Sequence, residues 1–430
     1  MDFAQSLEYL TDRDRVGIKL GLERIRAVME CLGQPQARTS GALVAGTNGK
    51  GSVCAMLSSI LGHCGYRVGL MAKPHLVSYR ERIQLDGRPI GEIDFAAAIS
   101  GVVDCLNQVG HRLGPPTQFE ILTAAGINFL APRCDLLVCE VGMGGRLDST
   151  NILDLNLAVI TNVDLDHTQY LGRTRAAIAA EKAAIIKPGS FVVSGCRNPA
   201  LAVVESAARR ARGLWRLGSE VTFQTTNLGL DGLRLSVRGP GFSHSGLHIP
   251  LVGAHQGRNA ALAVAAAEAL RRDDFAISND AIRSGLASVR WPGRLQLIAT
   301  HPQVIVDGSH NVKGMASMAV AVDAALPDTR PRVAVFGAMA DKDIGGMLRE
   351  LGRLRPTSVI FSKVASERAA TTAELAHAWS GTSLQVEPVG AAVELGRTLA
   401  GPDGVVVVCG SLYLVGEAMG ALGATASLEL

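Results

Sequence analysis

The sequence predicts an α/β protein with mostly parallel sheets in two regions of the chain. Hydrophobic residues make up 47% of the 430 residues and aromatic residues only 4%, and the chain contains 48 glycines. Aliphatic runs separated by many tight turns suit parallel sheets that are buried on both faces better than antiparallel sandwiches. At roughly 150 residues per domain, this length indicates two or three domains.

In the first region, short apolar runs alternate with amphipathic stretches. Strands are predicted at 43–45, 68–71, 136–139 and 157–160, with a helix over 50–64 after the first of them. Strands that alternate with helices form βαβ units and therefore a parallel sheet. A polar, Gly-rich stretch over 213–250 interrupts this pattern. Its alternation at 229–237 predicts antiparallel strands, and an Ala-rich helix is predicted over 259–270.

The second region follows Trp291-Pro292-Gly293-Arg294, a sequence typical of a turn or hinge. Beyond it, strands are predicted at 304–306, 333–336, 358–361 and 405–408. We therefore expect two domains, formed by residues 1–293 and 294–430.

Polar residues follow the predicted strands directly. Examples are 46–52, 73–75 and 140–142 in the first region and 307–311, 337–343 and 410–411 in the second. In open α/β sheets, ligands bind at the carboxyl ends of the strands. Two such edges in one chain predict a site between two domains.

Charge and composition exclude several classes of protein. Lys and Arg number 42 against 39 Asp and Glu, and no block of like charges favours a nucleic-acid or membrane-surface partner. Asp2 stands where a signal peptide would be basic, and the apolar run at 405–415 is too short to span a bilayer. The eight cysteines form no C-x-x-C pair, so we expect buried thiols in a reducing compartment rather than disulfides or zinc ligands. We expect a cytoplasmic protein.

The segment 46–52, GTNGKGS, lies between a predicted strand and a predicted helix. In that context glycines let backbone N–H groups surround phosphate oxygens, and Lys50 would neutralise β- and γ-phosphate charge. The segment departs from the strict G-x-x-x-x-G-K-[ST] pattern, because Val44 replaces the first glycine and Gly51 follows the lysine. The hydroxyl then comes from Ser52. A Gly-rich turn with a solvated lysine remains the alternative.

Two further residues suggest a divalent cation. Glu140 ends an apolar strand, where a carboxylate can hold Mg²⁺ on nucleotide phosphates, although it could also only cap a turn. His167 follows Asp166, and imidazole beside carboxylate is a plausible cation site, although isolated histidines are often structural. Lys182 lies on a predicted helix, where a solvated face is the ordinary interpretation.

In the second region, Asp307 and His310 follow a strand. Asp307 could accept hydrogen bonds from a ribose, and His310 could act on a nucleotide or substrate. Arg294 in the hinge could reach phosphate. A structural role remains open for each of the three.

Together these pieces resemble the folylpolyglutamate synthase/dihydrofolate synthase family within the Mur ligase superfamily. The resemblance runs from 19–25 (KLGLERI) to 410–417 (GSLYLVGE), and its most specific pieces are 46–52, 140–148 (EVGMGGRLD), 165–168, 181–183, 307–311 and 340–343. It implies a phosphate-loop ATPase domain with a mostly parallel sheet and a smaller C-terminal Rossmann-like ligase domain. It also implies ATP-dependent amide formation, in which a folate or dihydropteroate carboxylate becomes an acyl phosphate that L-glutamate attacks.

Site residues are carried over from the resemblance position by position. ATP contacts would be Thr47, Asn48, Gly49, Lys50, Gly51, Ser52, Asn259, Arg294 and Asp307. Mg²⁺ would be held by Glu140, His167 and Ser52, and the pterin pocket would be lined by Phe119, Glu120, Leu147, Asp148 and Ser149. Lys50, Lys182 and His310 would be the catalytic residues, with Lys182 modified to carboxylysine.

One position departs from the family. The family usually reads Ser-Pro-His-Leu after the second strand, with its serine on Mg²⁺, whereas this chain reads Lys73-Pro74-His75-Leu76. A protonated lysine cannot ligate a metal. Either the position has drifted in a surface loop, or the Lys73 ammonium replaces part of the metal's charge near the γ-phosphate.

The sequence is also compatible with three other functions: a Mur-type ligase acting on a non-folate acid, a phosphate-loop nucleotide binder without ligase activity, and a kinase. We expect a monomer whose partners are ATP, L-glutamate and dihydropteroate or tetrahydrofolate. The sequence leaves open which of the two pterin activities is present.

Overall fold

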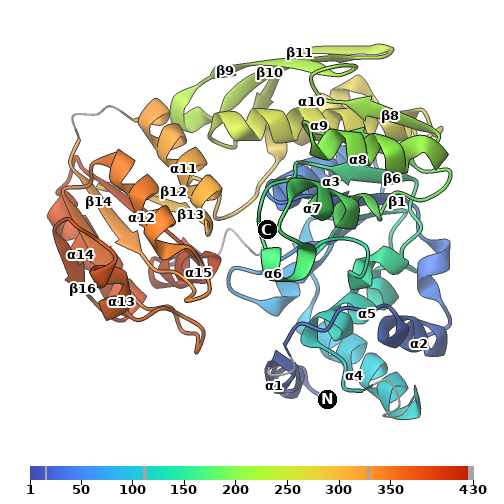
Figure 1. The fold of residues 1–430 in the computed structure, drawn as a ribbon, viewed down its shortest axis with the longest axis horizontal. Helices are drawn as coiled ribbons and strands as arrows, with labels where there is room; N and C mark the ends of the chain where they lie inside the picture. The colour runs from blue at the N-terminus through green and yellow to red at the C-terminus, as the bar shows by residue number, and fades with distance from the viewer. Residues whose placement is uncertain (15–16, 110–113, 327–329, 425–430) are drawn as a thin grey trace.

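The computed structural model describes residues 1–14, 17–109, 114–326 and 330–424 (Figure 1). An eight-stranded sheet has the order β4-β3-β2-β5-β1-β6-β7-β8. The six strands from β2 to β8 run parallel, and the β3–β4 hairpin adds an antiparallel edge, so the predicted parallel sheet is confirmed. The strands are β1 (Gly41–Ala45), β2 (Val68–Met71), β3 (Ile83–Leu85), β4 (Arg88–Pro89), β5 (Leu136–Glu140), β6 (Leu157–Ile160), β7 (Phe191–Ser194) and β8 (Gly213–Arg216).

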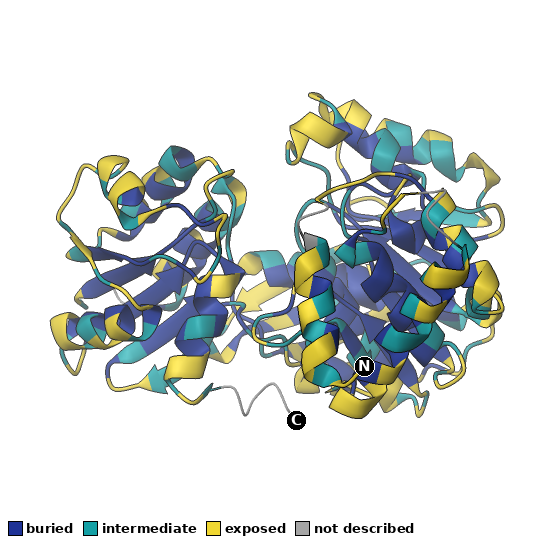
Figure 2. Cartoon of the chain, turned by 90° about the horizontal axis from the view of Figure 1, so that it is seen from below, coloured by how far each residue is buried: buried dark blue, intermediate teal, exposed yellow. Residues whose placement is uncertain are grey.

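Helices cover both faces of this sheet. Along β1, Ala42 and Val44 pack on the face of α3 (Lys50–His63) and α9 (Ala254–Arg271), whereas Leu43 and Ala45 pack on the opposite face. That opposite face carries α1 (Phe3–Asp14), α2 (Glu23–Cys31), α4 (Glu92–Val109) and α5 (Gln118–Leu130), with α7 (Arg175–Ala183) and α8 (Ala200–Ala207) beside β6 and β7. Burial on both faces explains why these strands read as continuous apolar runs (Figure 2).

A three-stranded antiparallel sheet, in the order β11-β10-β9, packs on α9 and α10 (Asn279–Ser288). Its strands are β9 (Thr222–Asn227), β10 (Leu233–Gly239) and β11 (Phe242–Ile249). Leu233, Leu235 and Val237 are buried while their neighbours face outward, so the alternation in the sequence is confirmed from 233 onward. Residues Gly229–Asp231 form a short 3₁₀ turn instead of strand, since the glycines at both ends adopt positive φ.

The second α/β unit has a six-stranded sheet in the order β12-β13-β17-β14-β15-β16, parallel except for the edge strand β12. Its strands are β12 (Gln296–Thr300), β13 (Gln303–Asp307), β14 (Arg332–Phe336), β15 (Ser358–Phe361), β16 (Ser383–Gln385) and β17 (Val405–Cys409). One face carries α11 (Val312–Ala325), α12 (Ile344–Leu351) and α13 (Thr372–His377), and the other carries α14 (Val389–Ala400) and α15 (Leu412–Ala421). The Rossmann-like second fold is confirmed.

Residues 289–295 connect α10 to β12 without helix or strand, in agreement with the turn predicted at 291–294. We propose that the domain boundary lies between residues 293 and 294. Among the described residues, no helix is both long enough and apolar enough to cross a membrane.

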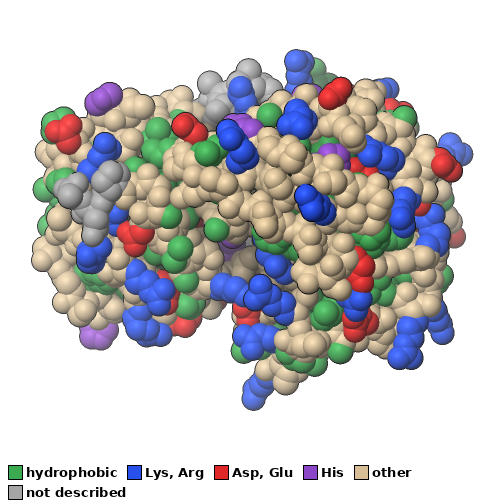
Figure 3. Space-filling view, turned by 90° about the horizontal axis from the view of Figure 1, so that it is seen from above, with side chains coloured by type: hydrophobic (Ala, Val, Ile, Leu, Met, Phe, Trp, Pro, Cys, Tyr) green, Lys and Arg blue, Asp and Glu red, His purple; other side chains and the backbone are tan. Residues whose placement is uncertain are grey.

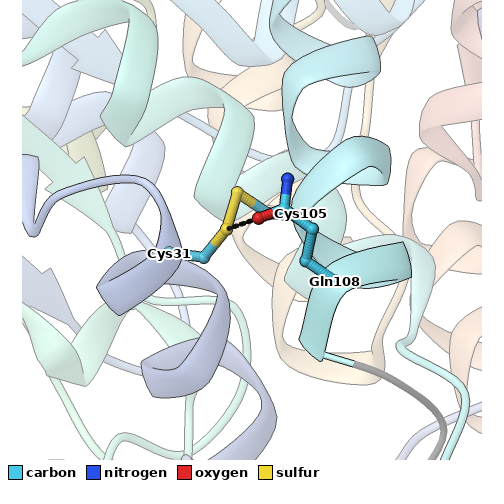
Figure 4. Close-up of a disulfide and its surroundings, with 3 residues drawn as sticks. All are labelled: Cys31, Cys105 and Gln108. Carbon is cyan, nitrogen blue, oxygen red and sulfur yellow. Dashed lines mark hydrogen bonds between the residues drawn. A yellow bond between two sulfur atoms is a disulfide. The ribbon is translucent and has the colours of Figure 1, made fainter.

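The cysteine prediction is wrong for one pair. Cys31, at the end of α2, and Cys105, in α4, form a disulfide with their Cα atoms 5.8 Å apart (Figure 4). The two cysteines are separated by 74 residues, and only the packing of α2 on α4 brings them together. The spacing of cysteines along the chain carries no signal of such a contact.

Candidate active site

A cavity of 620 Å³ lies between the two domains, at the carboxyl ends of β1, β5 and β6 on one side and β13 on the other. The surface is hollowed between the domains, and Lys and Arg side chains gather beside the hollow (Figure 3). Every residue predicted to contact ATP or metal lines this cavity, as do Lys182, His310 and Lys73: the set is Thr47, Asn48, Gly49, Lys50, Gly51, Ser52, Lys73, Glu140, His167, Lys182, Asn259, Arg294, Asp307 and His310.

The loop before α3 is tightly held. Gly49 caps α3 with a φ of 82°, and a Cβ at this position would lie 2.4 Å from Asn259 Oδ1. The Asn162 side chain accepts from the Asn48 N–H at 3.0 Å and donates to the Asn48 carbonyl at 2.9 Å. Lys50 is not a solvated lysine, because its Nζ donates to the Gly46 carbonyl at 3.1 Å. A glycine-bearing helix N-terminus with a lysine folded over it is an anion-binding arrangement.

Lys182 is buried on α7 rather than solvated on a helix face. Its Nζ donates to the same Gly46 carbonyl at 3.0 Å, so two lysine amines converge on one backbone oxygen. Burial, with the Lys50 charge second, lowers the pKa of Lys182 to about 7. The neutral amine is therefore a major form near physiological pH.

Glu140 and His167 lie on the same cavity from different strand ends. Glu140 is buried, and burial raises the pKa of its carboxyl group. His167 immediately precedes α6 (Thr168–Leu171), and partial desolvation lowers the pKa of its ring, which favours the neutral imidazole that metals bind. Within the described ranges, no three His, Cys, Asp or Glu side chains cluster so as to hold a metal ion. A divalent ion here would need phosphate oxygens as further ligands.

Asp307 and His310 supply the wall from the second domain. Asp307 Oδ2 accepts from the Leu295 N–H at 2.9 Å, and its Oδ1 accepts from the backbone and hydroxyl of Ser309. The carboxylate thus holds the linker to the end of β13 and retains a lone pair for a ligand hydroxyl. His310 Nδ1 lies 2.8 Å from the Gly308 carbonyl, and burial lowers the pKa of the ring to about 4. Nδ1 therefore carries the proton, and Nε2 is an acceptor.

Two contacts join the domains across the cavity. Asn311 Nδ2 donates to Asn48 Oδ1 at 3.2 Å, and Lys313 Nζ lies 2.5 Å from Asp164 Oδ2. The phosphate loop is thus in direct contact with the second domain.

The residues predicted to line a pterin pocket do not line this cavity. Glu120 caps α5 through Thr117 and pairs with Arg24 at 2.9 Å, so its carboxylate serves the local structure. Asp148 accepts from the Thr150 and Met143 N–H groups. Leu147 is exposed and Ser149 is buried in a short helix. Phe119 and Asp148 nevertheless adjoin the cavity wall, because a Cβ on Gly142 would lie 3.0 Å from Phe119 Cζ and 2.9 Å from Asp148 Oδ2.

Lys73 reaches toward those residues. Its Nζ is buried and lies 3.2 Å from the centroid of the Phe119 ring, while its own backbone N–H donates to Glu140 Oε2 at 3.1 Å. The expectation of a surface-loop position is therefore wrong for this ammonium group. The reason is that β2 ends beside β5, which turns the loop inward over Gly142.

Several cavity residues were missed by the sequence reasoning. Asn162 follows the end of β6. His255 and Arg258 lie in the first turns of α9, before the Ala-rich part that was predicted as helix. Arg197 follows β7, a strand that was not predicted. The rule that ligand-binding residues follow strands would have found Asn162 at once and Arg197 once β7 was known.

Known proteins resemble this chain over nearly its whole length. Residues 99–267 match the Mur ligase middle domain, and residues 293–412 match the Mur ligase glutamate ligase domain. The dihydrofolate synthase/folylpolyglutamate synthase of Bacillus subtilis is 34% identical over 425 residues, covering 96% of this chain and 98% of the relative. The chain belongs to the dihydrofolate synthase/folylpolyglutamate synthase family. It is a ligase of the Mur superfamily.

Solved structures of family members have the same fold. E. coli FolC in complex with DHPP and ADP has a TM-score of 0.89 and 32% identity, covering 99% of both chains. A bifunctional folylpolyglutamate synthase/dihydrofolate synthase with Mn, AMPPNP and L-glutamate bound has a TM-score of 0.85 and 30% identity, covering 98% of both chains.

Proposed function

We propose that this chain is an ATP-dependent ligase that joins L-glutamate to the carboxylate of a folate, a dihydropteroate, or both. One observation carries the proposal: a single cavity brings the phosphate loop after β1 together with Asp307 and His310 after β13. The solved relatives were obtained with ADP or AMPPNP, with DHPP and with L-glutamate, which are ligands of the kinds this reaction needs.

ATP would lie with its phosphates on the N-terminus of α3. Backbone N–H groups of the loop and the Lys50 ammonium would neutralise the phosphate charge, so that an anionic nucleophile can approach. Asp307 would accept from a ribose hydroxyl, and Arg294 and Asn259 would contact the nucleotide from the hinge and from α9. A ligand held by both domains would favour the closed arrangement that Asn311 and Asn48 already bridge.

Mg²⁺ suits the oxygen and imidazole donors of this cavity. Glu140, His167 and the Ser52 hydroxyl would hold the ion, with the remaining ligands coming from phosphate oxygens, as is usual for Mg²⁺. When bound, it supplies charge neutralisation on the transferring phosphoryl group. The relative with Mn bound supports a divalent ion at this kind of site.

Lys182 would carry a carbamate. A neutral amine is the form that reacts with CO₂, and the lowered pKa makes that form abundant. The modification would replace a buried cation next to Lys50 with an anion and so relieve the repulsion between the two amines. His310, with Nε2 unprotonated, would accept a hydrogen bond from substrate.

In the reaction, a carboxylate oxygen bonds to the γ-phosphorus of ATP, and ADP leaves with the electron pair of the broken phosphorus–oxygen bond. The glutamate amine then attacks the acyl carbon, and phosphate departs with the electrons of the acyl–oxygen bond while the amine loses its proton. The protein contributes mainly proximity and charge.

The test incubates the protein with MgATP, L-glutamate and either dihydropteroate or tetrahydrofolate, and measures ADP release and the pterin product by mass spectrometry. We expect ADP release to require both the pterin acid and glutamate, and the product to gain one glutamate residue. ADP release without an amine would indicate a kinase. ATP binding without turnover would indicate a nucleotide binder, and turnover only with another acid would indicate a different ligase. We expect the variant Lys50→Ala to lose this turnover, and Lys363→Ala, which replaces a lysine outside the cavity, is its control.

A further inference from the structure

Lys73 presents a buried charge that nothing in the proposed ATP site explains. Its Nζ is fully shielded from solvent, and in the part of the chain that the structure describes it has no hydrogen-bond acceptor. Its contact is the face of the Phe119 ring, 3.2 Å from the centroid. An ammonium group carries three donors, and burying it without an acceptor is costly even above an aromatic ring. The position is therefore suited to an acceptor that arrives with a ligand.

Nearby carboxylates do not fill this role. Asp148 Oδ2 accepts from the Met143 N–H at 2.8 Å, and Glu140 Oε2 accepts from the backbone N–H of Lys73 itself. Neither forms an ion pair with Nζ within the described residues. Burial lowers the pKa of Lys73, and the charges of Asp148 and Glu140 oppose that shift, while the donors of the ammonium form remain available.

The location of Lys73 indicates which ligand group would reach it. Lys73 lines the phosphate-loop cavity, and its Nζ lies beside Gly142, whose other neighbours are Phe119 and Asp148. It also lines a second cavity of 620 Å³, bounded by α3, β2, the end of α10 and the linker that follows it. The ammonium thus lies at the wall between the phosphate loop and the residues assigned to the pterin acid.

We propose that Lys73 binds the carboxylate of the acid substrate, the group that becomes phosphorylated. This inference rests on the proposed ligase function. An anionic carboxylate must approach an anionic triphosphate, and an ammonium paired with one carboxylate oxygen reduces their repulsion and orients the other oxygen toward phosphorus. That oxygen donates its electron pair to the γ-phosphorus, and ADP leaves with the pair of the broken bond. In the free protein the ammonium rests on Phe119 until the substrate replaces that contact.

Binding measurements without ATP or Mg²⁺ test this pairing directly. Dihydropteroate and its analogue lacking the carboxylate, an otherwise identical pterin aniline, are titrated into wild type, Lys73→Met and Lys73→Arg. Methionine keeps the unbranched apolar stem as far as the Cε position and lacks the ammonium group, and Lys363→Met is the control outside both cavities. We expect Lys73→Met to weaken dihydropteroate binding at least tenfold and analogue binding less than twofold. We expect Lys73→Arg to retain most of the wild-type preference for dihydropteroate over the analogue.

Each other outcome overturns the inference. An equal loss for both ligands would mean that Lys73 acts on the ring or on the shape of the pocket. No loss for either would mean that the charge is not used. If dihydropteroate binding is unchanged but Lys73→Ser shifts the Mg²⁺ midpoint of turnover, Lys73 replaces metal charge instead. Should Lys73→Met not fold, Lys73→Gln provides the same comparison.

The proposed function is tested separately in the same samples. Wild-type protein that neither binds dihydropteroate nor forms a glutamylated product contradicts both proposals. Wild-type protein that forms the product, together with a Lys73→Met variant that binds normally, contradicts only the role of Lys73.

Discussion

The lowered pKa of Lys182 has a measurable consequence for stability. Burial shifts the pKa from 10.5 in the ordinary side chain to about 7 in the folded protein. Between these two pH values Lys182 is protonated in the unfolded chain but neutral in the folded protein, so the free energy of unfolding rises with pH. Below pH 7 the buried amine is protonated as well, and the full cost of burying its charge lowers stability. At about 1.4 kcal/mol per pH unit, the penalty is roughly 4 kcal/mol at pH 7, and roughly 2 kcal/mol of it is relieved by pH 9.

Urea unfolding in CO₂-free buffer at pH 7 and pH 9 measures this effect. The comparison of wild type with Lys182→Met cancels the other titrating groups, and we expect the difference between the two proteins to change by roughly 2 kcal/mol in favour of wild type at pH 9. A difference that does not depend on pH would refute the reasoning that burial holds the amine neutral.

The same variant tests the carbamate. At pH 7.5 about three quarters of an amine with a pKa near 7 is neutral, against about 0.1% of an ordinary lysine. We expect ¹³C-bicarbonate to give a carbamate resonance in wild type and to raise turnover, and the resonance to be absent from Lys182→Met but present in Lys363→Met. A wild-type protein without the resonance and without a bicarbonate response would exclude the modification.

Three further predictions concern the phosphate loop and the domains. Lys50→Ala should reduce turnover by more than tenfold, measured as ADP release, because the variant loses the ammonium that would neutralise β- and γ-phosphate charge at the loop. A loss within tenfold, about 1.4 kcal/mol, would contradict the assignment. Gly49→Ala should weaken ATP binding, measured by calorimetry, and lower the melting temperature. The reasons are that residue 49 has a positive φ and that its new Cβ would lie 2.4 Å from Asn259 Oδ1. Normal affinity would show that the loop can shift. Small-angle scattering should show a smaller radius of gyration with an ATP analogue and a folate bound, because both domains contribute to the cavity, and an unchanged radius would argue against closure.

The sequence alone was sufficient to predict the parallel sheets and to select residues that the structure brings together around one cavity. Strands such as β2 and β15 were predicted at their observed bounds, since burial on both faces leaves a continuous aliphatic run. Gly49, Lys50, Glu140 and Asp307 were found because the end of a parallel strand is a local feature of the chain, and the sheet then brings all such ends to one edge.

Only the tertiary structure decided which partners the other side chains meet. Glu120, whose place in a pterin pocket stays a prediction, pairs through its carboxylate with Arg24, and Cys31 and Cys105 form a disulfide that the spacing does not indicate. The sequence left Lys73 open between a surface-loop position and a charge near the γ-phosphate, and the structure places its ammonium on Phe119. These contacts join segments far apart in sequence, and they depend on how α2, α4, α5 and the loop after β2 pack. Periodicity along a chain reports whether a side chain is buried, whereas the identity of its neighbour is set by which elements come together in space.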